Sequence, residues 1–207
     1  MRVFLTGATG FIGSRIIPEL LDAGHQVLGL TRSDAGARWL EASGAQVHRG
    51  TLEEADSLAR GAAEADAVIH AAFDHDFSRF AENCAKDARV IARMADALAG
   101  SDRPFIITSG VGLGSRGPGE LAVEQVVDWD HPNPRKASEQ AGAAALERGV
   151  SVAVVRLPQV HDTDKQGLIS PLIEIAREQA AAHFGWMAMF AALDMAASSD
   201  WTRAELG

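Results

Sequence analysis

Short apolar runs alternate along the chain with segments whose apolar residues recur at helical spacing. The apolar runs predict strands at residues 2–6, 26–32, 45–50, 67–73, 104–110 and 150–158. The helical spacing predicts helices at residues 11–24, 53–62, 77–98 and 137–149. Strands that alternate with helices in this way are typical of an α/β fold. We therefore predict a doubly wound parallel sheet flanked by helices.

Composition and charge narrow the classes of partner. The chain has 207 residues, 47% hydrophobic and 23% charged, which suits a globular protein with a full-sized core. Its formal net charge of -9 disfavours nucleic acids and anionic membrane surfaces. No apolar run approaches the roughly 20 residues that cross a bilayer, and Met1 leads into a strand without a signal-peptide pattern. We expect a cytoplasmic protein whose partner is a small-molecule substrate.

The chain has one cysteine, Cys84, which lies within the helical pattern of residues 77–98. A single cysteine can form neither an internal disulfide nor a cysteine-rich zinc site, so we expect no metal. The helical setting favours a buried, inert thiol over a reactive one.

The sequence TGATGFIG, residues 6–13, joins the first predicted strand to the first predicted helix. Gly7 permits a tight turn, Gly10 lets main-chain N–H groups approach a pyrophosphate, and Gly13 lets helix and strand pack closely. The helix N-terminus then faces the phosphate charge. This pattern predicts a Rossmann-type dinucleotide-binding domain over residues 1–162, with a merely structural turn as the alternative. The predicted contacts in the turn are Thr6, Gly7, Thr9, Gly10, Phe11, Ile12 and Gly13.

The residues that end the second predicted strand bear on the choice of nucleotide. NAD-binding proteins usually carry an acidic residue there, which bonds the ribose 2′-hydroxyl. This chain has Thr31, Arg32 and Ser33 instead. A guanidinium can pair with a 2′-phosphate in a bidentate manner. We therefore predict NADP(H) as the cofactor, with Arg32 and Ser33 in contact with it; a solvated surface role for Arg32 is the alternative.

These motifs resemble those of the short-chain dehydrogenase/reductase superfamily, in its extended or atypical, epimerase/dehydratase-like branch. The resemblance covers residues 1–178 and rests on TGATGFIG, VIHAAF (68–73), FIITSG (105–110) and VVRLPQVHD (154–162). It implies that Ser109 or Thr108 provides a hydroxyl for a substrate carbonyl. It also implies a cofactor groove lined by Leu52, His70, Ala71, Ala72, Phe73, Thr108 and Pro158.

The chain departs from the family where the catalytic tyrosine and lysine are expected, because it contains no tyrosine. In the sequence HPNPRKASE, aligning Glu139 with the family's glutamate puts Arg135 at the lysine position and His131 at the tyrosine position. His161 similarly stands where the family has a second tyrosine, after the last predicted strand. Thr51 replaces a usual aspartate. The resemblance therefore supports cofactor binding more strongly than it supports the usual chemistry.

Four residues are candidates for catalysis. Histidine is a competent acid near neutral pH, so His131 or His161 could replace the tyrosine. Asn133 and Pro134 predict a helix start after His131, which puts this histidine before the helix and favours a loop role over a chemical one. Arg135 could bind a ribose or a carboxylate but cannot relay protons. Ser109 could bond a carbonyl or, equally, cap a turn.

Residues 163–207 predict a short helical substrate-binding region. Residues 167–178 and 183–207 resemble separate family segments, joined here by only a few residues. Either several tens of residues are absent between Arg177 and His183, or the protein is short by nature. The aromatic and methionine run at residues 184–190 is expected to form core, a pocket wall or a homodimer contact.

Three functions remain open on the sequence alone. The first is an NADP(H)-dependent oxidoreductase that acts on a small carbonyl or hydroxyl compound. The second is a non-catalytic NADP(H) sensor, suggested by the missing tyrosine. The third is a non-redox isomerase or cyclase on the same fold.

Overall fold

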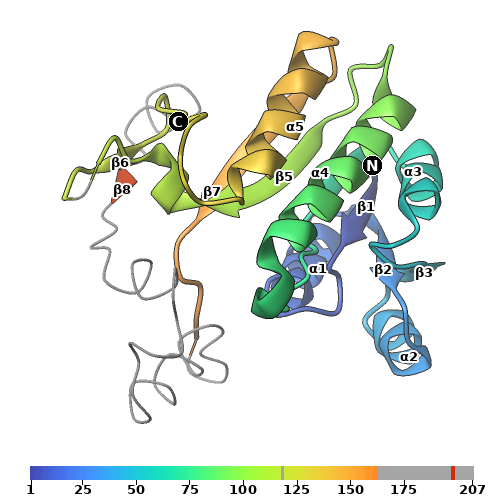
Figure 1. The fold of residues 1–207 in the computed structure, drawn as a ribbon. Helices are drawn as coiled ribbons and strands as arrows, with labels where there is room; N and C mark the ends of the chain where they lie inside the picture. The colour runs from blue at the N-terminus through green and yellow to red at the C-terminus, as the bar shows by residue number, and fades with distance from the viewer. Residues whose placement is uncertain (118, 163–196, 199–207) are drawn as a thin grey trace. The chain divides into compact units, whose positions relative to one another are not determined.

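Six strands form the central sheet of the protein, whose computed structural model describes residues 1–117, 119–162 and 197–198 (Figure 1). The sheet order is β3-β2-β1-β4-β5-β7. β1 pairs in parallel with both β2 and β4, so the strand order reverses direction beside β1. This reversal creates the crevice in which open α/β sheets bind ligands. The strands are β1 (Arg2–Thr6), β2 (Gln26–Thr31), β3 (Gln46–Arg49), β4 (Ala67–His70), β5 (Phe105–Gly110) and β7 (Val152–Leu157).

Helices cover both faces of the sheet, which confirms the predicted doubly wound fold. Successive strand residues point to opposite faces; accordingly Phe4 packs in one core and Leu5 in the other. The core around Phe4 includes α3, α4 and α5, and the core around Leu5 includes α1 and α2. The helices are α1 (Gly13–Asp22), α2 (Asp34–Ala42), α3 (Ala55–Ala63), α4 (Phe80–Leu98) and α5 (Lys136–Glu147).

Three elements differ from the sequence predictions. Helix α2 was not predicted, because only two of its residues, Ala37 and Leu40, are buried. Two apolar positions are too few to show a helical period in the sequence. The predicted helix 77–98 is divided into η1 (Phe77–Arg79) and α4. The α5 helix begins at Lys136. The Asn133 side chain nevertheless accepts a hydrogen bond from the Arg135 N–H at 2.9 Å, as the side chain of an N-cap residue would.

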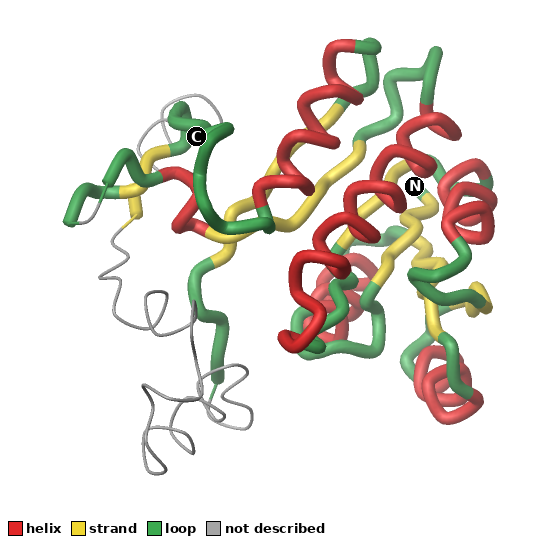
Figure 2. The backbone as a smooth tube through the Cα atoms, in the orientation of Figure 1, coloured by secondary structure: helices red, strands yellow, loops and turns green. Residues whose placement is uncertain are grey.

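The chain divides into two units, one of Met1–Ser109 with Pro132–Val155 and the other of Gly110–His131 with Arg156–Gly207. The second unit contains η2 (Val111–Gly114), in a glycine-rich stretch of the chain, and a parallel pair of β6 (Ala122–Val123) and β8 (Ala197–Ser198) (Figure 2). The rest of the predicted substrate region, 163–196 and 199–207, lies outside the described residues. No helix in the described part is long and apolar enough to cross a bilayer.

Candidate functional site

The turn after β1 has the geometry that its glycines predict. Gly7 has a φ of 67°, in the left-handed region that favours glycine. A Cβ on Gly7 would lie 2.7 Å from the Ala72 backbone nitrogen, and one on Gly13 would lie 2.2 Å from the Gly7 carbonyl oxygen. The Gly10 N–H closes the turn by donating to the Gly7 carbonyl at 2.9 Å. Backbone atoms on both sides thus leave no room for side chains at Gly7 and Gly13.

The outer side of this turn fits a pyrophosphate. Thr9 and Gly10 are exposed, Phe11 and Ile12 are half-buried, and α1 begins immediately after them. The first amides of a helix have no partners within the helix and carry positive partial charge, which suits an anion. A dinucleotide phosphate would therefore be held by the main chain of residues 9–13.

At the end of β2, Arg32 is exposed and makes no hydrogen bond or ion pair with any residue that the structure describes. Ser33 is the N-cap of α2 and accepts a hydrogen bond from the Gly36 N–H at 3.0 Å. The neighbouring Arg49, in contrast, pairs with Asp34. Arg32 is thus an exposed cation at the carboxyl end of β2 that pairs with no carboxylate in the described part of the chain.

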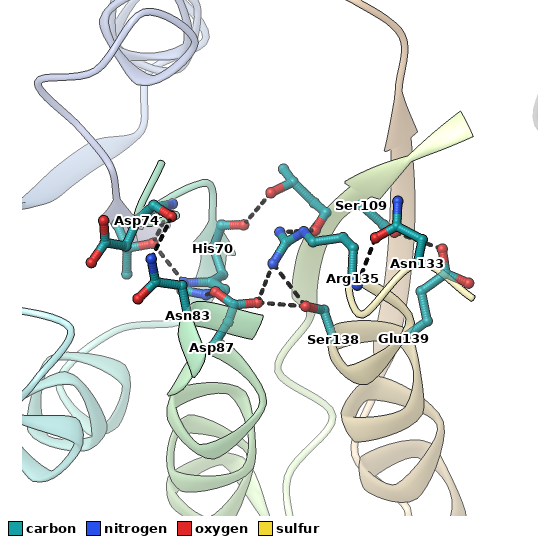
Figure 3. Close-up of polar contacts among 12 residues, drawn as sticks. His70, Asp74, Asn83, Asp87, Ser109, Asn133, Arg135, Ser138 and Glu139 are labelled. Atoms are coloured by element: carbon teal, nitrogen blue, oxygen red, sulfur yellow. Dashed lines mark hydrogen bonds and ion pairs between the residues drawn. The ribbon is translucent and has the colours of Figure 1, made fainter. Parts of the chain in front are cut away.

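A buried chain of polar side chains starts directly below the turn (Figure 3). The Thr6 hydroxyl oxygen lies 2.7 Å from Nδ1 of His70. The same oxygen accepts a hydrogen bond from the Ala72 N–H at 3.1 Å. Nε2 of His70 donates to Asp87 at 3.0 Å, since a carboxylate can only accept. His70 is fully buried, so its side chain packs beneath the groove and does not line it.

Asp87 connects this chain to Arg135. The carboxylate accepts hydrogen bonds from Arg135 Nη1 and from the Ser138 hydroxyl, both at 2.6 Å. Burial opposes ionisation of Asp87, but the neighbouring His70, Arg135 and Ser138 lower its pKa to about 2. Arg135 also donates to the Thr108 carbonyl at 3.0 Å. The Asp87 carboxylate is therefore ionised near neutral pH, and its hydrogen bond fixes the Arg135 guanidinium in place.

The hydroxyls at the end of β5 point to protein partners. Ser109 donates to Glu139 at 2.7 Å, and both residues are buried. Thr108 donates to the His70 carbonyl at 3.0 Å and so ties β5 to β4. Ser109 and Arg135 thus each bond to buried groups of the protein, and their predicted roles toward a substrate stay predictions.

The segment after β4 supplies a group of aromatic rings, of which the sequence analysis singled out only Phe73. The Phe73 ring lies 4.0 Å from the Arg135 guanidinium carbon, in cation–π geometry. His75 meets the Phe73 ring edge-on, with centroids 5.3 Å apart. Phe77 and Phe80 continue the group. The sequence signal for it is the aromatic spacing in AFDHDFSRF, residues 72–80.

An ion-pair cluster anchors the same segment to α4. Lys86 donates to Asp74 at 2.8 Å and to Glu53 at 2.6 Å. The Asn83 amide donates to the carbonyls of Asp74 and Asp76, at 3.3 and 2.9 Å. Four hydrogen bonds from one helix therefore hold the loops that follow β3 and β4. In the first of these loops, Leu52 packs half-buried against the core.

Cys84 is buried in α4, and burial raises the pKa of its thiol to about 11. Nearby Arg135 opposes this shift and Asp87 adds to it. Relative to the ordinary value of 9.0, the thiolate fraction falls about 100-fold. We expect Ellman's reagent to modify the native protein at least ~100-fold more slowly than the unfolded chain at pH 8. Equal rates in buffer and in denaturant would contradict the buried, inert thiol.

The remaining candidates belong to the second unit. His131 is half-buried, and its backbone N–H donates to the Asp128 carbonyl at 3.3 Å. His161 is exposed, and its Nδ1 lies 2.9 Å from the Gln159 carbonyl. Pro158 is exposed in the same stretch. Their roles toward a ligand stay predictions.

A doubly wound sheet with a glycine turn and a helix N-terminus at its switch point defines a nucleotide-binding protein of the Rossmann class. A family described as NAD(P)H-binding matches residues 7–180. The chain belongs to this NAD(P)H-binding family.

Curated relatives share sequence over most of this chain but are longer. An uncharacterized protein of Schizosaccharomyces pombe is 41% identical over 185 residues, which are 89% of this chain and 62% of the relative. One from Saccharomyces cerevisiae is 40% identical over 86% of this chain and 60% of its own length. The 4-hydroxy-2-methyl-3-oxo-4-farnesyl-3,4-dihydroquinoline-1-oxide ketoreductase of Stigmatella aurantiaca is 28% identical, over 90% of this chain and 58% of the relative. The chain thus spans about 60% of these proteins.

Solved structures agree on the fold. UDP-glucuronic acid 4-epimerase from Bacillus cereus, in complex with NAD, has a TM-score of 0.63 at 20% identity, over 78% of this chain and 57% of that one. Vestitone reductase from alfalfa has a TM-score of 0.57 at 21% identity, over 75% of this chain and 56% of that one.

Proposed function

We propose that the protein is an NADP(H)-dependent oxidoreductase that acts on a small carbonyl or hydroxyl compound. The observation that carries the choice of cofactor is Arg32, an exposed cation directly after β2 that pairs with none of the residues that the structure describes. A 2′-phosphate would neutralise it through charge-assisted hydrogen bonds. The names of related ketoreductases support carbonyl reduction as the reaction.

Different residues of the first unit would bind different parts of the cofactor. The main chain of residues 9–13 would hold the pyrophosphate, and Arg32 the 2′-phosphate. Phe73 and Arg135 would border the nicotinamide end. The reduced nicotinamide, when bound, supplies a hydride for a carbonyl carbon. The substrate-binding part stays a prediction for residues 163–207.

Replacing Arg32 by alanine tests the cofactor choice directly. Charge-assisted hydrogen bonds contribute about 1.5–3 kcal/mol, so we expect NADPH to bind R32A roughly 10- to 100-fold more weakly. Affinity for NADH should change less than about twofold. Isothermal titration calorimetry measures both. R38A, which removes an exposed arginine of α2, is the matched control. An unchanged preference of R32A for NADPH over NADH would rule out the role of Arg32.

The reaction is tested by loss of NADPH absorbance with a panel of diacetyl, benzaldehyde, cyclohexanone and isatin. We expect turnover with at least one of these carbonyl compounds. Tight NADPH binding without any turnover on a wide panel would reject the oxidoreductase.

The second candidate is a non-catalytic NADP(H)-binding module. It is favoured by one specific observation: Ser109 and Arg135, at positions where relatives of the fold do chemistry, both bond to buried protein groups. This candidate predicts NADPH binding by calorimetry together with complete lack of turnover. Turnover that depends on the bound cofactor would exclude it.

A further inference from the structure

We propose that His75 is the proton donor in the proposed carbonyl reduction, in place of the tyrosine that the chain lacks. This inference rests on the proposed function. Three observations support the assignment. They are the location of His75, the groups that surround it, and the hydrogen bonds that the other candidate donors make to protein groups.

His75 lies in the segment that follows β4, at the carboxyl edge of the sheet, where ligands of open α/β folds bind. The start of this segment borders the glycine turn, since the Ala72 nitrogen would be 2.7 Å from a Cβ on Gly7. Next along the segment, the Phe73 ring contacts both the Arg135 guanidinium, at 4.0 Å, and the His75 ring, at 5.3 Å. The imidazole therefore lies against the ring that also contacts Arg135, three residues past the backbone that borders the glycine turn.

The other candidate donors at this edge of the first unit are engaged. His70 has no exposed surface, and both of its ring nitrogens take part in buried hydrogen bonds. The Ser109 hydroxyl donates its proton to Glu139. Arg135 remains charged and cannot give up a proton near neutral pH.

The remaining histidines described in the first unit lie elsewhere. His25 precedes β2, at the opposite edge of the sheet from the glycine turn, where its ring contacts the amino terminus. His48 lies within β3, packs edge-on against Phe4 and bonds Ser57 through Nε2. The His75 residue is exposed, although the rings beside it partly desolvate its imidazole. One ring N–H bonds the Phe73 carbonyl, and the imidazolium carries a second N–H.

The surroundings of His75 make its protonated form a better proton donor than a free imidazolium. The apolar rings beside the imidazole lower the pKa of His75 from its ordinary 6.5 by desolvation, and the Arg135 cation lowers it further. The Phe73 carbonyl and the Asp74 carboxylate oppose these effects. Asp74 is itself paired with Lys86 at 2.8 Å, which limits its influence. The imidazolium is thus disposed to give up its proton.

The proton transfer and the hydride transfer together conserve atoms and charge. An imidazolium N–H bond of His75 breaks, and an O–H bond forms on the carbonyl oxygen. The carbonyl carbon accepts the hydride, and with it two electrons, from NADPH, so that the product is an alcohol and NADP⁺. The neutral imidazole then regains a proton from water.

Two variants at this position separate chemistry from packing. H75F keeps an aromatic ring against Phe73, and H75Q keeps a polar side chain, but neither can donate an imidazolium proton. General acid catalysis contributes about 10²–10⁴-fold, so we expect kcat to fall at least ~100-fold in both variants with the fastest carbonyl of the panel. The NADPH Kd, measured by calorimetry, should stay within about threefold. H25Q, at the opposite edge of the sheet, should match the wild type.

The pH dependence provides a readout that packing alone would not change. The imidazole signals of His75, followed by NMR in the cofactor-free protein, should titrate with a midpoint below 6.5. The wild-type kcat/KM for reduction should fall tenfold per pH unit above the same midpoint, and this step should be absent in H75Q. Wild-type kcat in H75F and H75Q, or a titration midpoint above 7, would overturn the assignment and leave the proposed function intact. A wild type without turnover would overturn the proposed function and the donor role together.

Discussion

Replacing Asp87 by alanine is expected to lower the free energy of unfolding by about 3–5 kcal/mol, the usual cost of removing one partner from a buried ion pair. The side chain of Asp87 is 1% exposed and that of its partner Arg135 is 13% exposed. His70 and Ser138 are buried and would lose the same acceptor. Urea unfolding followed by circular dichroism measures the loss. D96A, on the same helix, removes exposed ion pairs and should cost less than about 1 kcal/mol.

The D87N variant is expected to differ from the wild type in how its free energy of unfolding depends on pH. The pKa of Asp87 is about 2 in the folded protein, against an ordinary 3.8. A lowered carboxyl pKa stabilises the fold at pH values above 3.8, and this stabilisation is lost as pH falls toward 2. The difference amounts to about 2 kcal/mol. Wild type should therefore lose about 2 kcal/mol more than D87N over that pH window. Parallel acid-unfolding curves would show that Asp87 is not ionised in the fold.

The fold could be predicted because its signals are local and repeated. Most strands of the sheet are short apolar runs, although β3 has Val47 as its one apolar residue. Helix α4 shows a long helical period that places Val90, Ile91 and Met94 in the core. Helix α2 was missed since it buries only two apolar side chains. The helix start near residue 133 was displaced, because the Asn133 cap precedes a turn before α5 begins.

The candidate site could be predicted only where its residues are contiguous. The turn at residues 6–13 brings its own glycines together, so the sequence spacing was enough to locate it. Asp87 and Arg135 are 48 residues apart, and Ser109 and Glu139 are 30 apart. No local period reveals that these side chains meet. The sequence analysis therefore found Ser109 and Arg135 but not their buried partners.

A Gly13→Ala substitution is expected to weaken NADPH binding at least ~100-fold, or about 3 kcal/mol. The added Cβ would lie 2.2 Å from the Gly7 carbonyl oxygen and 2.8 Å from the Ala8 Cα, both backbone atoms that no side-chain rotation can move away. The turn would have to open, and its N–H groups would lose their convergence on the pyrophosphate. Calorimetry with NADPH gives the affinity, and circular dichroism checks that the fold persists.

The control for this variant is G117A, because a Cβ at Gly117 meets no atom within 4 Å and the residue lies outside the turn. G117A should bind NADPH as the wild type does. A folded G13A protein with wild-type affinity would mean that the phosphate does not rest on the turn after β1. Since both Arg32 and His75 are assigned relative to a cofactor held there, that result would remove the basis for the NADP(H) preference and for the proton donor alike.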